Sequence, residues 1–331
     1  MLAYLTIIHQ KPPFEKHSLP CYTQKKRGGG PVDGEKGRRL TLTVASAWDG
    51  EKIDTLLRRE LGLSGTVIKR IKWLEDGILL DGVRAITGQR AAAGQVLSVR
   101  VDDPDRPDAV LPMPGPVDVV YEDQDLLVVN KAPGVTVHPG PGNGRETLCN
   151  YIAYYYRQKG EPSGVHPVHR LDRGTSGLLV MAKHPLAQER LKGQLHTDAF
   201  RRIYLAVCDG VPVPEQGRVE APIGRVPGSL IMRQADPSGQ PAATRYRVVE
   251  RAGDRALVEL ALETGRTHQI RVHMAWLGCP LTGDFLYGRE DRALIARPAL
   301  HSSELFLTHP ITGAALHWTA PLPEDMAALL R

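Results

Sequence analysis

The chain has 331 residues, enough for two or three domains of ordinary size, and 42% of them are hydrophobic. Its formal net charge of +5 suits a polyanionic partner such as nucleic acid, although many ordinary proteins share this balance. No apolar run reaches membrane-spanning length, and the short apolar start lacks the charged region and cleavage site of a signal peptide. The four cysteines are far apart and form no CxxC, which argues against a zinc ribbon or a disulfide framework. We therefore expect a protein of the reducing cytoplasm.

Residues 1–38 predict a disordered basic tail. The stretch "KKRGGGPVDGEKGRR" is rich in glycine and positive charge and has no apolar period with which to bury a core. Such a tail can sample RNA phosphates as a flexible arm. A solvated extension, or an incorrectly assigned start of the sequence, explains the composition equally well.

Residues 39–100 predict a compact unit that contains two short helices. Gly62 ends the first helix, Ser64 is the expected N-cap of the second, and Gly77 ends that one. Short strands follow in "ILLDG" and "VLSVRV". The apolar stripes of the two helices are Ile53, Leu56, Leu57 and Leu61, then Val67, Ile68, Ile71 and Leu74.

Three basic residues, Lys69, Arg70 and Lys72, lie mostly off the second stripe. Two short helices, one of them basic, followed by strands resemble the small S-four-like RNA-binding domain, and this resemblance implies that the three residues contact RNA. Two positions depart from its usual pattern, because Asp81 replaces an Asn and Gly65 stands where an Arg is common. The alternative is a generic helical domain with a solvated basic face.

Residues 101–116 are rich in proline and aspartate, which predicts an extended linker. Over residues 117–331 short strands alternate with helices, and many connections have hairpin length. This pattern favours an α+β fold with a mainly antiparallel sheet. The main expected elements are strands within 117–131, a helix within 146–160, a strand within 176–184, a helix within 185–198, a strand within 201–210 and a hairpin within 245–265.

The first constellation that could carry chemistry is "HRLDRGTSG", residues 169–177, directly before an apolar strand. Asp172 stands between Arg170 and Arg173, whose charges would keep its carboxylate ionised and therefore suited to a nucleophile or a general base. The alternative is a structural salt bridge. A protein-kinase loop is disfavoured, because Leu171 interrupts the H-R-D order and D-F-G is absent.

The second constellation is "LETGRTHQIRVHMAWLG", residues 262–278. Thr267 is the expected cap of a helix that presents His268 and Arg271 on one side, near the helix start. A zinc site at His268 and His273 is disfavoured because no third ligand stands nearby. The buried stripe of this helix is expected to be Ile270, Met274 and Leu277.

A third residue, Tyr204, lies on a predicted strand and alone would be ordinary. Together, however, "HRLDRGTSGLLVMAK", then "RRIYLAV", then "TGRTHQIRVHMAWLGCPLTGDFLYG" resemble the RluA/RluD-type pseudouridine synthases. The resemblance extends over roughly residues 40–318 and includes "VVNKAPGVTVHPG". One departure is Ala132, because the family usually has proline directly after the lysine.

The resemblance implies an isomerase that converts uridine in RNA to pseudouridine without a metal, a redox step or a cofactor. The family's catalytic aspartate corresponds to Asp172, its active-site tyrosine to Tyr204, and its basic residue to Arg271, which would pair with Asp172. It leaves open whether Asp172 attacks C1′, attacks C6 or abstracts a sugar proton.

The remaining expectations concern RNA. Arg170 resembles the arginine that fills the space of the flipped base, while His169 and Arg173 would support the loop or touch phosphate. Arg266 and His268 are also expected to contact RNA. The S-four-like domain favours large-subunit ribosomal RNA. Transfer RNA and a non-catalytic RNA-binding or ribosome-assembly role are the alternatives, and a monomer is the default.

Overall fold

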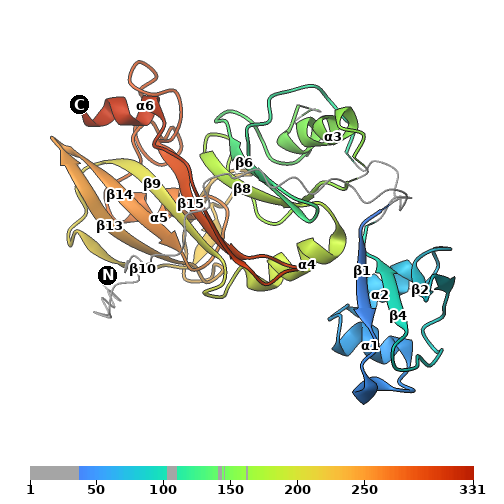
Figure 1. Ribbon diagram of the computed structural model, residues 1–331. Helices are drawn as coiled ribbons and strands as arrows, with labels where there is room; N and C mark the ends of the chain where they lie inside the picture. The colour runs from blue at the N-terminus through green and yellow to red at the C-terminus, as the bar shows by residue number, and fades with distance from the viewer. Residues whose placement is uncertain (1–36, 103–109, 141–143, 145, 162) are drawn as a thin grey trace.

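The computed structural model describes residues 37–102, 110–140, 144, 146–161 and 163–331, which form a small N-terminal unit and a larger sheet covered by helices (Figure 1). The predicted tail of residues 1–38 thus lies almost wholly outside the described residues. None of the helices in these ranges combines the length and the apolar composition that crossing a membrane requires.

The N-terminal unit joins a four-stranded antiparallel sheet to two short helices (Figure 1). Its elements are β1 (Arg39–Thr43), the 3-10 helix η1 (Ser46–Trp48), α1 (Ile53–Arg59), α2 (Gly65–Ile71), β2 (Ile78–Leu80), β3 (Val83–Arg84) and β4 (Val96–Arg100). The strand order is β1-β4-β2-β3. Both helices and β4 contribute to one apolar core, in which Ile53, Leu57, Ile71 and Leu97 are fully buried.

Both predicted helices of this unit are confirmed, and so are the N-cap at Ser64 and the glycine end at Gly62, whereas the predicted end of the second helix at Gly77 is wrong because α2 stops at Ile71. The Ser64 hydroxyl accepts a hydrogen bond from the Val67 backbone N–H at 3.3 Å, as an N-cap does. Gly62, just after α1, has φ of +59°, a conformation that favours glycine. Helix α2 ends at Ile71, so Leu74 lies beyond it.

The predicted linker ends earlier than its composition indicates. The Met113 N–H donates to the Asn150 carbonyl at 3.1 Å, and the Asn150 side chain donates to the Leu111 carbonyl at 2.7 Å. Val110 packs against the main core. Residues 110–116 therefore lie along the helix that contains Asn150, because its amide satisfies their backbone groups; residues 103–109 lie outside the described part of the chain.

The larger unit is built on a ten-stranded sheet, which runs β10-β13-β14-β9-β15-β8-β6-β5 with β16 beside β15 and β7 beside β8 (Figure 1). Within the described residues, β15 and β8 pair in parallel and the other pairs of this sheet are antiparallel. The α+β fold with a mainly antiparallel sheet is thus confirmed. The strands are β5 (Val119–Glu122), β6 (Leu126–Lys131), β7 (His166–Pro167), β8 (Ser176–Ala182), β9 (Arg201–Asp209), β10 (Gln216–Glu220), β13 (Ala243–Ala252), β14 (Arg255–Leu262), β15 (Leu300–Thr308) and β16 (Ala315–Thr319), with β11 (Ile223–Arg225) and β12 (Arg233–Ala235) forming a separate hairpin.

The helices of this unit are α3 (Leu148–Gln158), α4 (Pro185–Gln194), α5 (Gln269–Trp276), α6 (Glu324–Ala327) and the 3-10 helix η2 (Ala328–Leu330). Helices α3 and α4 cover opposite faces of β6. Leu127 packs in one core cluster with Ile152 of α3, whereas Val128 packs in another with Leu191 of α4. Because both faces of β6 and β8 are buried, these strands have continuous apolar runs instead of alternation.

One glycine makes the central strand pairing possible. Gly177, at the start of β8, has φ of +108°, and a Cβ added there would lie 2.3 Å from the Ser302 carbonyl oxygen of β15. No side chain fits this approach. The glycine thereby brings the loop that precedes β8 against the middle of the sheet.

The two units contact each other directly. The Arg38 guanidinium forms two hydrogen bonds with the Asp125 carboxylate, at 2.7 and 3.1 Å. Arg190 of α4 donates to the Leu61 carbonyl at 2.5 Å, and Leu186 packs into the core of the N-terminal unit. Helix α4 therefore packs against both units.

Candidate active site

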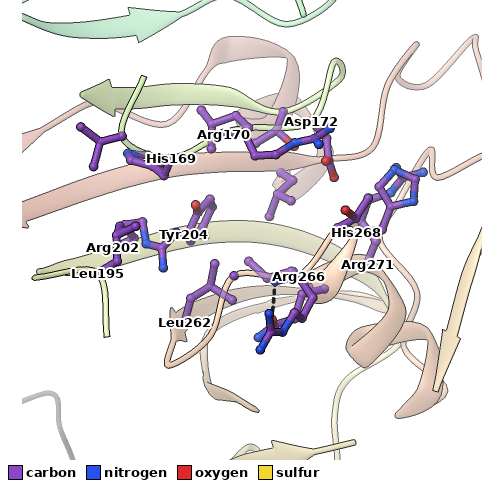
Figure 2. A pocket seen from close by; sticks show the side chains of 18 of the residues that line it. His169, Arg170, Asp172, Leu195, Arg202, Tyr204, Leu262, Arg266, His268 and Arg271 are labelled. Atoms are coloured by element: carbon purple, nitrogen blue, oxygen red, sulfur yellow. Dashed lines mark hydrogen bonds between the residues drawn. The ribbon is translucent and has the colours of Figure 1, made fainter. Parts of the chain in front are cut away.

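A cavity of about 260 Å³ opens where the loop before β8, the start of β9 and the turn into α5 meet. The three sequence motifs thus converge although up to about a hundred residues separate them. Figure 2 shows Asp172 and His268 on one side of this pocket and Arg202 with Leu195 on the other, with Tyr204 between them. The pocket is small, which suits one planar base.

Asp172 presents its carboxylate to this pocket. Its backbone carbonyl accepts a hydrogen bond from Thr175 N–H at 3.1 Å, which holds the loop in a turn. Within the described residues the carboxylate itself accepts no hydrogen bond and forms no ion pair. Among the described residues neither neighbouring arginine contacts this carboxylate: Arg170 is exposed, and Arg173 donates to the Gly134 carbonyl at 3.0 Å.

A buried lysine, Lys131, is hydrogen-bonded to the loop that contains Asp172. The Lys131 ammonium donates to the carbonyls of Ala132 and Val135 at 2.9 Å and to that of Arg173 at 3.4 Å. Burial lowers the pKa of Lys131 to about 7, against the opposing attraction of Asp172. Lys131 therefore joins the "NKAPG" loop to the residue that follows Asp172.

Arg271 makes its ion pair elsewhere than expected. Its Nε and Nη2 atoms each lie 2.7 Å from an oxygen of Asp284, and both side chains are buried. Asp284 also accepts from the backbone N–H groups of Leu286 and Tyr287 at 3.0 and 3.3 Å. The predicted pairing of Arg271 with Asp172 is therefore wrong as a direct contact. Arg271 faces the same pocket and acts on Asp172 through its charge over a longer distance.

The turn into α5 differs from the predicted cap. The residue that precedes the helix is His268, with φ of +58°, and not Thr267. The side chain of Gln269 holds this turn, because its oxygen accepts from the Thr264 hydroxyl at 2.8 Å and from Arg266 N–H at 2.9 Å. The left-handed backbone at His268 directs its ring toward the pocket (Figure 2).

The two histidines of this motif have different environments. His268 Nδ1 lies 2.8 Å from the Tyr287 hydroxyl. Burial lowers the pKa of His268, while Asp172 opposes the change and Arg271 adds to it. His273 is a core residue, with its ring nitrogens 2.9 Å from the Thr244 hydroxyl and 3.0 Å from the Ala221 carbonyl.

Tyr204 lies on β9, where it pairs with Leu260 and Ser302 of the neighbouring strands. The ring is buried and lines the pocket. Burial raises the pKa of Tyr204, and the positive charge of Arg202 only partly offsets this effect. At neutral pH the side chain is therefore a neutral phenol that can donate a proton.

His169 lines the pocket, but its ring nitrogens do not face solvent. Both ring nitrogens are shielded from solvent, and the ring packs edge-on against Phe200 with centroids 5.7 Å apart. Burial lowers the pKa of His169 far below its usual value, so the ring is neutral. A neutral ring with shielded nitrogens favours support of the loop over a phosphate contact, the two roles predicted for His169.

The predicted basic residues of the N-terminal unit lie on and just after α2. Lys69 and Lys72 are exposed, whereas Arg70 is half-buried. Trp73, which the sequence pattern did not single out, is 74% exposed, and the Lys72 ammonium lies 4.8 Å from the centre of its ring. An exposed tryptophan beside lysines is a surface on which a nucleic-acid base can stack.

Sequence reasoning also missed three residues of the site: Asp284, Lys131 and Arg202. Asp284 stands in the "TGDFLYG" stretch that the family motif includes, but a single aspartate after a glycine carries no local signal of its partner. Arg202 stands two residues before Tyr204, and the alternation of a strand puts both on one face. The two-residue period of the strand was therefore the signal that could have identified Arg202.

Comparison with known proteins agrees with this geometry. Residues 125–276 match the RNA pseudouridylate synthase family. The chain is 38% identical over 300 residues to the uncharacterized RNA pseudouridine synthase YhcT of Bacillus subtilis, covering 90% of this chain and 98% of that protein. It is 38% identical over 307 residues to ribosomal large subunit pseudouridine synthase D of Yersinia pestis, covering 88% and 94%.

Among solved structures, human RNA pseudouridylate synthase domain containing 1 superposes with a TM-score of 0.54 at 27% identity. The match covers 66% of this chain and 90% of that one.

Proposed function

Since the chain belongs to the RNA pseudouridylate synthase family, with relatives of the RluA/RluD type, it is an isomerase that acts on uridine in RNA, and we propose that its target lies in large-subunit ribosomal RNA. The observation that carries this proposal is that a synthase named for the ribosomal large subunit matches 88% of the chain. We also propose the cytoplasm as its location, because large ribosomal RNA is made there in bacteria.

In the proposed reaction Asp172 acts on the target nucleoside. The N1–C1′ bond breaks, C5 bonds to C1′, C5 loses a proton and N1 gains one, so substrate and product have the same atoms. A carboxylate without a partner supports this role, because a hydrogen-bonded or paired carboxylate would be a weaker nucleophile or base. Attack at C1′, attack at C6 and abstraction of a sugar proton all begin with an ionised Asp172.

The other pocket residues divide the remaining tasks. Arg271, held by Asp284, supplies positive charge to the pocket that Asp172 lines without occupying the oxygens of Asp172. Tyr204 offers a flat ring against the uracil and a phenol that can donate a proton. These groups act only on a base that has left its stack, at a cost of a few kcal/mol. The exposed Arg170 is free to occupy the vacated space.

We further propose that residues 39–100 form an S-four-like RNA-binding domain, with Lys69, Lys72 and Trp73 on its RNA-facing surface. The exposed lysines supply phosphate contacts, and the exposed indole supplies a stacking surface. The direct contacts of this unit with α4 hold it beside the catalytic sheet.

The test is pseudouridine mapping of total RNA from a strain that lacks the protein and from its parent. We expect one or more pseudouridines of large-subunit ribosomal RNA to disappear and to return on complementation and on incubation of the deficient RNA with purified protein. Loss confined to transfer RNA would overturn the ribosomal assignment. An unchanged map together with no product in vitro would overturn the role of this site.

A further inference from the structure

The pocket holds one buried cation that the catalytic scheme does not use. Arg202 is only 5% exposed, and its Nε atom has no hydrogen-bond partner. No carboxylate of the described residues lies within 4.0 Å of its guanidinium nitrogens, and no described group accepts a hydrogen bond from them. An unpaired buried charge is costly, so its retention points to an anion that arrives with the substrate.

The surroundings of Arg202 do not neutralise it. The neutral ring of His169 and the Phe200 ring, whose centre lies 5.8 Å from the guanidinium carbon, flank the side chain. Tyr204 is a neutral phenol on the same face of β9. Asp172 lines the same cavity without forming an ion pair with Arg202.

Arg202 also lines a second and larger cavity of about 900 Å³ that adjoins the pocket. Leu195, His196, Arg202 and Leu262 line both cavities, so one ligand can extend from the first into the second. We call the second cavity the groove.

The other arginines of the groove already have partners. Arg218 and Arg245 both bind Glu263, and Arg218 also binds Glu220. Arg201 has its guanidinium 4.3 Å from the centre of the Phe306 ring. Among the groove's described arginines, Arg202 is therefore the buried one that offers free donors.

We infer that Arg202 binds a backbone phosphate of the RNA next to the target uridine, and that the groove takes the strand as it leaves the pocket. The inference rests on the proposed function, because it assumes that the base in the pocket belongs to an RNA chain. A guanidinium presents two parallel N–H donors to a phosphate. A phosphate is thus the anion in RNA that matches this group.

The spacing along β9 agrees with this assignment. Arg202 and Tyr204 are two residues apart on one face, so their Cα atoms are separated by about 6.6 Å. A base against Tyr204 therefore has its own backbone within reach of Arg202.

The test compares Arg202→Ala with Arg251→Ala in the full-length protein. Arg251 is an exposed arginine at the far end of β13, outside both cavities, and its loss changes the net charge equally. Binding is measured on an in vitro transcript of large-subunit ribosomal RNA at several salt concentrations. We expect Arg202→Ala to weaken binding about 10- to 100-fold and to reduce the salt slope by about 0.7, whereas Arg251→Ala changes neither.

Two further variants separate binding from folding. Arg202→Lys should recover most of the affinity, because it restores the charge. Arg202→Met should melt at or above the wild-type temperature yet bind as weakly as Arg202→Ala, because it removes a buried charge. A lower melting temperature for Arg202→Met, with affinity lost only in proportion to unfolding, would overturn the inference.

A thermodynamic cycle that combines the Arg202→Ala variant with a modified RNA then locates the phosphate that Arg202 contacts. On an oligoribonucleotide that carries the mapped uridine, a neutral methylphosphonate replaces one flanking phosphate at a time. At one linkage the wild-type protein should lose affinity while Arg202→Ala loses none. Additive losses at every linkage would contradict the inference. Pseudouridine formation by the wild type in the same assay tests the proposed function separately.

Discussion

The two units of this protein hold positive charge in opposite ways. In the N-terminal unit Lys69 and Lys72 extend into solvent beside Trp73, which is 74% exposed. In the larger unit, which contains the candidate active site and is called the catalytic unit below, Arg271 and Arg202 are only 4% and 5% exposed. Exposed charges attract RNA over a Debye length and are screened by salt, whereas buried charges act at fixed positions. From this contrast we expect that capture of RNA and alignment of its uridine are separable tasks.

The largest effect should come from Asp172→Asn, which keeps the shape of the side chain and removes its charge. We expect pseudouridine formation to fall by at least about a thousandfold, because the amide is neither a nucleophile nor a base. RNA affinity should stay within about twofold of wild type, since Asp172 contacts no charged partner. The measurements are single-turnover product formation and RNA binding.

The matched control is Asp254→Asn, in the exposed turn between β13 and β14. It should retain full activity. If Asp172→Asn were as active as this control, Asp172 could not be the catalytic residue.

The next effect concerns the Arg271–Asp284 pair. Arg271→Ala and Asp284→Asn should each lower the single-turnover rate about 100-fold, because either change displaces the charge that faces Asp172. Since each leaves a buried group without its partner, each should also destabilise the protein by about 3–5 kcal/mol. Chemical denaturation and rapid-quench assays measure the two losses.

The double variant sharpens this prediction. If the two residues act as one unit, combining Arg271→Ala with Asp284→Asn should cost little more activity than either change alone. Fully additive losses would mean that Asp284 acts independently of Arg271.

A third prediction concerns acid stability of the catalytic unit. Burial raises the pKa of Glu122, but hydrogen bonds from Lys159, Lys183 and Tyr155 outweigh this effect and lower the pKa to about 2. The lowered pKa contributes at most about 3 kcal/mol of stability, which is present above about pH 4.5 and lost as the pH falls toward 2.

We therefore expect Glu122→Gln to be less stable than wild type at neutral pH, with the two curves converging near pH 2. Urea denaturation between pH 2 and 7 measures the difference. A constant gap over that range would show that the carboxylate charge is not what Glu122 contributes.

The smallest effect should come from the exposed cations of the N-terminal unit. Lys69→Ala with Lys72→Ala should weaken RNA binding about 3- to 10-fold at low salt and less at high salt, because two phosphate contacts are lost. The rate at saturating RNA should not change. A reduced saturating rate with unchanged affinity would reverse the division of tasks between the units.

Much of the local structure could be predicted because its signals are local. The N-cap of α2 at Ser64, the glycine after α1 at Gly62, the apolar run of β8 and the hairpin of β13 and β14 all depend on neighbouring residues. The cap of α5 could not be predicted in this way. The side chain of Gln269 holds that turn by hydrogen bonds, and its amide also donates to Ala243 and Thr244 of a strand distant in sequence.

The family, the α+β fold and the candidate site residues Asp172, Tyr204 and Arg271 could all be predicted from the amino-acid sequence, because ordered motifs along the chain carry this information. The partners of these residues became apparent only in the folded chain. Asp284 pairs with Arg271, Arg173 donates to the Gly134 carbonyl, and Arg202 has no ion pair among the described residues. The physical reason is that an ion pair depends on a few ångströms of separation between side chains, and strand pairing sets that separation between residues far apart in the chain.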